Sequence, residues 1–270
     1  MTQRMKLWNF FQMESQSLKP AFGPAVHVDQ MGDAPSVIVV CEHASNRVPA
    51  HLDGLGLKDE TLTRHIAWDP GALPVAQGLS QQLGAVLVHG GISRLVYDCN
   101  RPPDAPDAIP ERSEVFEIPG NTALSDAARD ARIAQVYRPF SSMLTEQIGV
   151  HRAHLRMMVT VHSFTPIFRD QMRAVQIGIL HGDDDRLAQA MMQSIPADLD
   201  MNVQLNEPYS AADGVAHTLN RHAVPYGLPN VMIEIRNDLI ESTAQQANIA
   251  QVLAHWVTTA EAAMSERNNM

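Results

Sequence analysis

Short runs of apolar residues alternate along the chain with longer amphipathic segments. The strand-like runs cover 37–40, 85–89, 94–98, 157–163, 174–182, the start of 203–210, and 230–240. Apolar residues recur at helical spacing in 69–84, 125–148, 184–195, 212–223 and 243–264. Strands that alternate with helices form sheets covered on both faces. The pattern therefore predicts a three-layer α/β sandwich with a mixed, mostly parallel central sheet.

The run from Val37 to Val40 is the clearest strand in this pattern. It is too short and too β-branched for a helix, and it lacks the alternation of a strand with one solvent-exposed face. Such a run is typical of a central strand in a parallel sheet, buried on both sides. Glu42 and His43 follow it almost directly. They are expected at the carboxyl end of the sheet, where open α/β sheets bind their ligands.

The chain length of 270 residues, 45% of them hydrophobic, favours one large domain. Residues 1–30 are expected to be a partly ordered lead-in, and 31–270 a single α/β domain. The segment 101–120 contains five prolines and is predicted to be a long irregular loop. Ser125 is the expected N-cap of the helix that follows, which Pro139 should interrupt.

A net charge of −10 and a pI near 5.6 argue against a nucleic-acid or anionic-membrane partner. No segment reaches the ~18 apolar residues of a membrane span, and the N-terminus lacks the apolar core of a signal peptide. With only Cys41 and Cys99, a reducing cytoplasm is the expected compartment. Cys41 is interpreted as a small buried residue rather than a nucleophile. A homo-oligomer is left open.

Polar residues collect at the expected carboxyl ends of strands or just beyond them. They are Glu42, His43, Asp69, His162, His181 and Glu234. Two histidines and one carboxylate, with an open fourth position, are a typical ligand set of catalytic zinc. A further glutamate nearby could take a proton from water and pass it to a leaving amine. The chain has no HExxH motif, so the alternative is that these histidines cap strand ends by ordinary hydrogen bonds.

Three arginines suggest recognition of an anionic substrate. Arg94 begins and Arg101 ends the segment RLVYDCNR, and Arg236 lies two residues after Glu234. In an extended strand Arg236 and Glu234 would face the same side. Guanidinium groups bind carboxylates with two parallel hydrogen bonds. The alternative for each arginine is a surface ion pair.

Other polar residues allow two readings each. His65 could orient Asp69 or simply pack, and His181 is interpreted as structural. His217 and His222 lie on a predicted helix, where a cap and a substrate contact cannot be separated. Tyr209 could donate to an oxyanion or pack at the rim. Ser163 follows His162 without a GxSxG elbow, which disfavours a serine nucleophile.

Six motifs occur in order along the chain: EHASNRVP, HIAWDPGA, SRLVYDCNRPPD, TVHSFTP, NEPYS and IEIRNDLI. In these motifs the chain resembles the N-formylglutamate amidohydrolase family over about residues 36–258. The resemblance implies an α/β sandwich similar to that of zinc-dependent exopeptidases. It also implies hydrolysis of an N-formyl amino acid, such as N-formyl-L-glutamate to formate and glutamate.

The resemblance implies that His43 and His162 are metal ligands, with zinc the expected ion. Asp69 is the expected third ligand and Glu42 the runner-up. Better-known members tend to have proline at the position of Glu42, and Asn46 stands where related exopeptidases place the glutamate of a His-x-x-Glu pair. The remaining implied roles are general base for Glu234 and binding of the substrate carboxylate or oxyanion for Arg94, Asn100, Arg101 and Arg236.

Three functions compete at this point. The first is a metal-dependent amidohydrolase that acts on a small N-acyl amino acid. The second is a metal-dependent amidase or peptidase for a larger amide, in which the 101–120 loop would shape an open cleft. The third is a non-catalytic protein that binds a small molecule through its arginines.

Overall fold

The computed structural model describes residues 22–268, and its centre is a seven-stranded sheet with the order β1-β3-β2-β6-β11-β9-β10. The strands are β1 (Val26–Gln30), β2 (Val37–Cys41), β3 (Val86–Gly90), β6 (Met157–Phe164), β9 (Ile177–Leu180), β10 (Val203–Leu205) and β11 (Asn230–Arg236). The four central strands β3, β2, β6 and β11 are parallel. β1 runs antiparallel to β3, β9 runs antiparallel to β11, and β10 is parallel to β9. The predicted mixed, mostly parallel sheet is confirmed.

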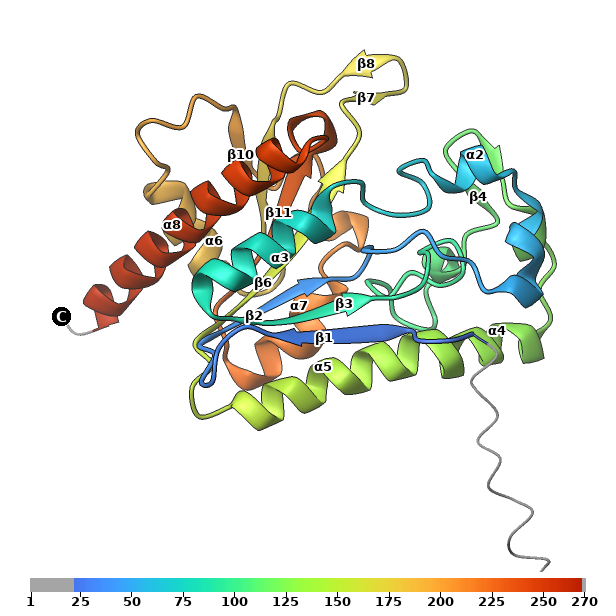
Figure 1. The fold of residues 1–270 in the computed structure, drawn as a ribbon, viewed down its shortest axis with the longest axis horizontal. Helices are drawn as coiled ribbons and strands as arrows, with labels where there is room; N and C mark the ends of the chain where they lie inside the picture. Colours follow the sequence, from blue (N-terminus) through green and yellow to red (C-terminus); the bar gives the residue numbers. More distant parts are fainter. Residues whose placement is uncertain (1–21, 269–270) are drawn as a thin grey trace, which may run out of the picture.

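Helices cover both faces of the sheet (Figure 1). One layer contains α3 (Ala72–Leu83), α6 (Arg186–Gln193) and α8 (Thr243–Asn268), and the other contains α5 (Arg138–His151) and α7 (His217–His222). The side chains of β2 pack against both helix layers. Val37 and Val39 join the core under the first layer, while Ile38 and Val40 join the core under the second. An unbroken apolar run is required because neither side of this strand meets water.

The helical segment after the irregular loop is interrupted as expected. Ser125 caps α4 (Asp126–Arg132) by accepting a hydrogen bond from the backbone N–H of Ala128. A π-helical turn (Ile133–Tyr137) then leads into α5, which has Pro139 in its first turn. Proline has no N–H to donate to the preceding turn, so a locally wider turn accommodates it.

Two expectations about strands differ from the structure. Residues 94–98 were predicted to be a strand, and this is wrong: they form a turn in which the N–H of Val96 donates to the carbonyl of Ser93. Their apolar side chains are nevertheless buried in the core. Conversely, β1 lies inside the expected lead-in and pairs with β3 at the sheet edge. The rest of that lead-in, residues 1–21, lies outside the described residues.

The remaining elements are short. They are α2 (Asp59–Leu62), the hairpin of β4 (Arg112–Ser113) and β5 (Phe116–Glu117), and the hairpin of β7 (Ile167–Phe168) and β8 (Gln171–Met172). Short 3₁₀ segments cover Ala50–Gly56, Pro106–Ala108, Pro119–Asn121, Ala211–Asp213, Val224–Tyr226 and Asn237–Leu239. The β7–β8 hairpin projects beyond the sheet (Figure 1).

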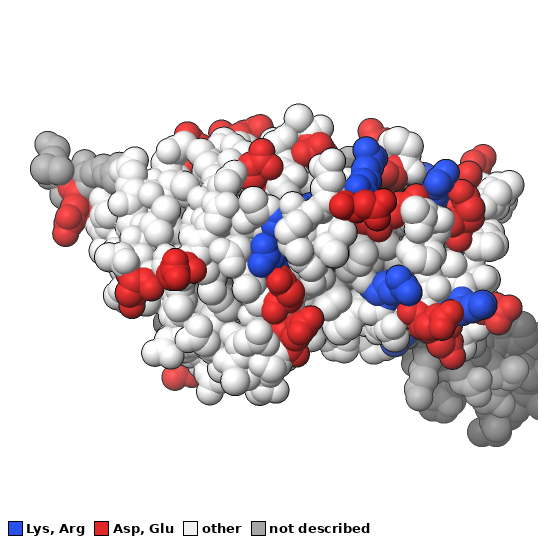
Figure 2. Space-filling view, turned by 90° about the horizontal axis from the view of Figure 1, so that it is seen from above, with Lys and Arg blue, Asp and Glu red and all other residues white. Residues whose placement is uncertain are grey.

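The surface is charged without being strongly basic. On the face in Figure 2, lysine and arginine side chains lie among acidic ones, and the described residues form no continuous basic patch there. Within residues 22–268, no helix combines the length and the apolar character needed to cross a membrane.

Candidate functional site

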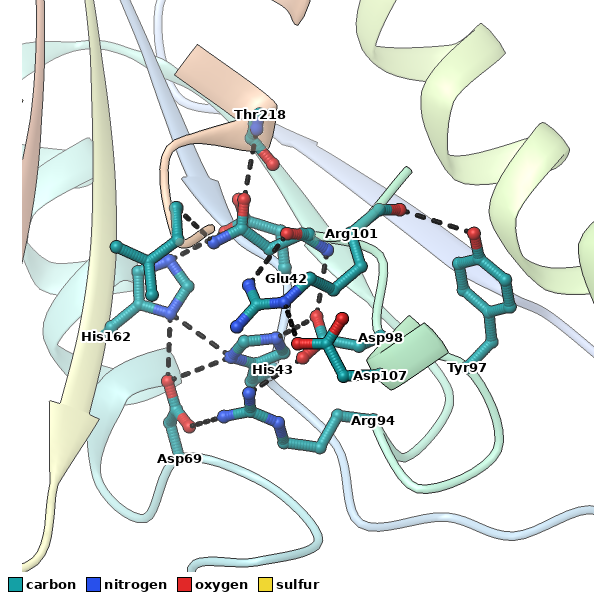
Figure 3. Close-up of polar contacts among 12 residues, drawn as sticks. Glu42, His43, Asp69, Arg94, Tyr97, Asp98, Arg101, Asp107, His162 and Thr218 are labelled. Atoms are coloured by element: carbon teal, nitrogen blue, oxygen red, sulfur yellow. Dashed lines mark hydrogen bonds and ion pairs between the residues drawn. The ribbon is translucent and has the colours of Figure 1, made fainter. Parts of the chain in front are cut away.

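Three side chains from distant parts of the chain meet at the carboxyl end of the sheet (Figure 3). His43 follows β2, His162 lies near the end of β6, and Asp69 lies in the loop before α3. The two Nδ1 atoms of the histidines are 3.2 Å apart. Oδ2 of Asp69 is 3.3 Å from Nδ1 of His43 and 3.0 Å from Nδ1 of His162. All three residues are buried, and this cluster could hold a metal ion.

The spacing of these atoms suits a tetrahedral ion. With bonds of about 2.0–2.1 Å, two ligands of tetrahedral zinc lie about 3.3 Å apart. The three separations, 3.0 to 3.3 Å, come close to that value. Both histidines direct the same ring atom, Nδ1, toward Asp69. The residues present therefore fit a zinc ion with two imidazole ligands and one carboxylate ligand.

The far side of the His43 ring is fixed by a carboxylate. Nε2 of His43 lies 2.7 Å from Oδ1 of Asp98. A carboxylate can only accept, so Nε2 donates to Asp98, and in the neutral ring this leaves the lone pair of Nδ1 facing the cluster. Arg94 donates to the other oxygen of Asp98 at 2.7 Å. Burial opposes the charge of Asp98, but Arg94 and then His43 outweigh it and hold its pKa well below the usual value.

The His162 ring has a comparable neighbour in Glu42. Nε2 of His162 is 3.1 Å from Oε2 of Glu42, an ion-pair contact between buried groups. Burial opposes ionisation of Glu42, but His162 lowers its pKa below the usual value. Glu42 therefore lies behind one histidine, on the side away from Asp69. Of the two carboxylates considered for the third ligand, only Asp69 contacts both Nδ1 atoms.

The loop that carries Asp69 is held at several points. The backbone N–H of Asp69 donates to the carbonyl of His43 at 2.9 Å, and the N–H of Ser163 donates to Oδ2 of Asp69 at 3.3 Å. Gly71 has φ +79°, and a Cβ there would lie 2.5 Å from the backbone oxygen of Ile240. Glycine is thus required for the turn that brings Asp69 to the two histidines. Arg94 adds a longer contact of 3.5 Å to Oδ1 of Asp69.

Glu234 lies next to the cluster because of strand register. It is the partner of His162 in the parallel β6–β11 pair. Its side chain is buried, and its Oε2 has no hydrogen-bond partner among the described residues. Burial raises the pKa of Glu234 to about 7. A carboxylate with such a pKa can both take up and release a proton near neutral pH.

A cavity of about 300 Å³ opens beside these groups. Most of the residues predicted for the site line it, namely His43, Asp69, Arg94, Asn100, Arg101, His162, Tyr209 and Glu234. His65 also lines it and contacts Glu114 at 2.9 Å. The cavity therefore collects the predicted ligands, the predicted base and most of the predicted substrate contacts in one place.

Two of the predicted substrate contacts also hold loops together. Asn100 donates to the carbonyl of Val215 and accepts from the N–H of Thr218, at 2.6 and 3.0 Å. Arg101 binds Asp107 at 2.6 Å and the carbonyl of Gly214 at 3.1 Å. These contacts tie the segment after Asp98 to the region of α7, which closes one wall of the cavity.

Arg236 lies elsewhere. It is not among the residues that line the cavity, so the expectation that it shares the cavity with Glu234 is wrong. It ends β11, and its guanidinium donates to Asp238 at 2.8 Å and to the carbonyl of Arg173 at 2.9 Å. Arg236 is still in register with Phe164 of β6, but its side chain is held by Asp238 and by the backbone of Arg173 and does not enter the cavity.

The other candidates are placed outside the cluster. His181 contacts Asn206, His217 contacts the hydroxyl of Tyr137, and His222 lies between Ser141 and Thr145. None of these three histidines lines the 300 Å³ cavity. Burial raises the pKa of the Cys41 thiol well above its usual value, which disfavours a thiolate nucleophile.

Sequence reasoning missed Asp98. It lies inside the motif SRLVYDCNRPPD, at the end of residues 94–98, which were predicted to be a strand. The available signal was an acidic residue four positions after Arg94, a spacing that allows an ion pair across one turn. The pairing with His43, 55 residues away, depends on the tertiary fold.

Comparisons with known proteins place the chain in a family. A solved gene product of Agrobacterium tumefaciens is 46% identical, covers 90% of this chain and 97% of its own, and superposes with a TM-score of 0.87. The N-formylglutamate amidohydrolase of Ralstonia eutropha is 18% identical, covers 90% of this chain and 98% of its own, and shares the fold with a TM-score of 0.59. No curated protein matches the chain. The family model for N-formylglutamate amidohydrolase matches residues 35–241, well over half of the sequence, and the chain therefore belongs to the N-formylglutamate amidohydrolase family.

Proposed function

We propose that this amidohydrolase is metal-dependent and hydrolyses the amide of a small N-acyl amino acid such as N-formyl-L-glutamate. As a member of its family it is a hydrolase of carbon–nitrogen bonds other than peptide bonds. The observation that carries metal dependence is the triangle of His43, Asp69 and His162, with donor atoms 3.0 to 3.3 Å apart. The Nε2 atom of each histidine faces a buried carboxylate, which leaves Nδ1 for the ion.

Zinc held by these three groups would supply Lewis acidity, which polarises an amide carbonyl and makes water a better nucleophile at neutral pH. The chain's own residues prepare the site for it. Asp98 keeps the proton of His43 on Nε2, and the N–H of Ser163 orients Asp69. The cluster is thus arranged before substrate arrives, which reduces the cost of reorganisation during the reaction.

Glu234 is the proposed general base and acid. It takes a proton from the attacking water at a carboxylate oxygen, and it then delivers that proton to the leaving nitrogen. Its position beside His162 and its unpartnered Oε2 support this role. Its pKa of about 7 matches a group that must change protonation state twice in each cycle.

The cavity of about 300 Å³ suits a small substrate. Arg94 lines it and is the proposed contact to the developing oxyanion, while it also binds Asp69 and Asp98. Tyr209 also lines the cavity and is the proposed further donor. A larger amide is the second candidate, because another cavity shares Tyr209 and Asp213 with the first.

The test is a substrate panel with controlled metal content. Chelator-treated protein and zinc-reloaded protein are assayed on N-formyl-L-glutamate, N-acetyl-L-glutamate and a glutamyl dipeptide, and released formate, acetate and amine are measured. We expect hydrolysis of an N-acyl amino acid by the zinc-loaded protein only. Equal rates in both preparations would reject metal dependence, and turnover of the dipeptide alone would favour the second candidate.

A further inference from the structure

Arg173, in the segment after the β7–β8 hairpin, has its guanidinium surrounded by three aromatic rings. Its Cζ atom lies 4.6 Å from the ring centre of Phe168, 4.9 Å from that of Tyr209 and 5.4 Å from that of Phe164. The side chain is half-buried. Its backbone is fixed as well, since its N–H donates to Pro166 and its carbonyl accepts from Arg236. The guanidinium is therefore held in one orientation by aromatic rings and backbone contacts.

The hydrogen bonds of Arg173 leave part of its guanidinium unused. Nη1 donates to the hydroxyl of Tyr209 at 2.9 Å and to the carbonyl of Thr165 at 3.5 Å. Within residues 22–268, no acceptor contacts its Nε or Nη2, and no carboxylate forms an ion pair with it. These two atoms form the edge that binds a carboxylate with two parallel hydrogen bonds.

The other arginines near the cavity differ on this point. Arg94 binds Asp69 and Asp98, Arg101 binds Asp107, and Arg236 binds Asp238. Each of those charges is already matched by a carboxylate of the chain. Arg173 is matched only by neutral groups, so its charge remains available to a ligand.

Arg173 also lines a cavity of about 610 Å³ that adjoins the catalytic one. Tyr209 and Asp213 line both cavities, so they share a wall. Glu207 lines the larger cavity too, but it is exposed, and Asp213 is bound by the backbone N–H of Ser210. A bound carboxylate would therefore find one oriented guanidinium there, with the acidic neighbours solvated or already engaged.

We propose that Arg173 is a specificity-determining residue that binds a carboxylate of the substrate through its Nε and Nη2 atoms. The substrate then lies across the shared wall, with its amide at the metal centre and its carboxylate in the larger cavity. This inference rests on the proposed function and names the substrate class more closely: an N-acyl amino acid, or a longer acidic amide, whose carboxylate is required for binding.

The experiment compares Arg173→Gln and Arg173→Lys with the zinc-loaded wild type. Arg169→Gln is the matched control, because Arg169 is an exposed arginine of the same hairpin that lines neither cavity. The substrates are N-formyl-L-glutamate, which has both carboxylates, and two amides that each lack one. N-formyl-L-glutamine lacks the side-chain carboxylate, and the α-amide of N-formyl-L-glutamate lacks the α-carboxylate. Zinc content is measured for every variant.

We expect Arg173→Gln to raise KM for N-formyl-L-glutamate by about 10-fold or more, because a hydrogen bond to a charged group is lost. KM for one of the two amides should change little, which identifies the carboxylate that Arg173 binds. Arg173→Lys should fall between, since lysine keeps the charge and loses the two-pronged geometry. Equal KM changes for all three substrates, or none, would overturn the inference.

The proposed function can fail separately. If the zinc-loaded wild type hydrolyses none of the three compounds, the proposed substrate is wrong, and calorimetric binding of L-glutamate to the same proteins then decides the role of Arg173. Binding that is at least ~10-fold weaker in Arg173→Gln than in Arg169→Gln would support it. Equal or absent binding in both would overturn it.

Discussion

The metal cluster and the Arg173 cavity are neighbours with opposite arrangements of polar groups. In the cluster, the chain places a buried carboxylate at Nε2 of each histidine: Asp98 for His43 and Glu42 for His162. In the adjoining cavity, Arg173 presents donor atoms to which the described chain supplies no acceptor. The first region is organised by contacts within the protein, and the second is organised to make contacts with something else.

This difference separates chemistry from recognition. Buried, mutually oriented groups suit a reaction centre, because they need not rearrange while charge moves. A half-buried guanidinium held on aromatic rings suits recognition, because its orientation is set before the ligand binds. Substitutions in the cluster should therefore change kcat or metal affinity, and substitutions at Arg173 should change KM.

The largest effect is expected for Glu234→Gln. Glutamine keeps the shape but cannot accept the proton, so kcat should fall ~10²–10⁴-fold on the best substrate. Zinc content should stay at the wild-type level, because Glu234 is not one of the three clustered donors. Steady-state kinetics with elemental analysis measures both, and near-normal kcat in the zinc-loaded variant would remove Glu234 as the base.

Zinc should stabilise the folded protein through the cluster alone. At 100 times its Kd, an ion that binds only the folded state adds about 2.7 kcal/mol. For a chain of this size that raises Tm by roughly 5–10 °C. The shift should vanish in His162→Ala and persist in His255→Ala, an exposed histidine on α8. Thermal unfolding with and without zinc tests this, and a shift retained in His162→Ala would contradict it.

Asp98→Asn should lower zinc affinity roughly 10- to 100-fold, as expected when the carboxylate behind a histidine ligand is lost. Asp107→Asn is the matched control, since Asp107 pairs with Arg101 and contacts neither histidine. Competition with a chelating dye measures both affinities. Equal affinities in the two variants would show that Asp98 does not orient His43.

The smallest effect is expected for Arg236→Gln. Arg236 lies outside the catalytic cavity and binds Asp238, and it contacts Arg173 only at the backbone carbonyl, so kcat should stay within about 2-fold and KM should rise much less than in Arg173→Gln. The contrast with Arg173→Gln is the point of the measurement. A KM increase of ~10-fold or more in Arg236→Gln would restore the role that its sequence position suggested.

The sequence predicted the sheet best where strands are buried on both faces. β2, β6 and β9 are fully buried and apolar over most of their length. β1 was missed because an edge strand with mixed exposure has a weaker pattern. The run 94–98 is as apolar as a strand, yet it is buried as a turn, and a short apolar run does not separate these cases.

The site residues that could be predicted from the sequence are those at strand ends or in family motifs. His43, Asp69, His162 and Glu234 follow strands or lie in family motifs, and the structure brings them together. Asp98 and Arg173 were not singled out, because their importance comes from partners that only the tertiary fold supplies. Asp98 is important because the fold places it beside His43. Arg173 is important because the fold places no carboxylate of the described residues beside it.

Anomalous diffraction at the zinc absorption edge, from crystals of the zinc-loaded protein, tests the central claim most directly. We expect one strong peak about 2.0–2.2 Å from Nδ1 of His43, Nδ1 of His162 and a carboxylate oxygen of Asp69. A peak bound through Nε2, a peak that includes Glu42 in place of Asp69, or no peak at this cluster would contradict the account.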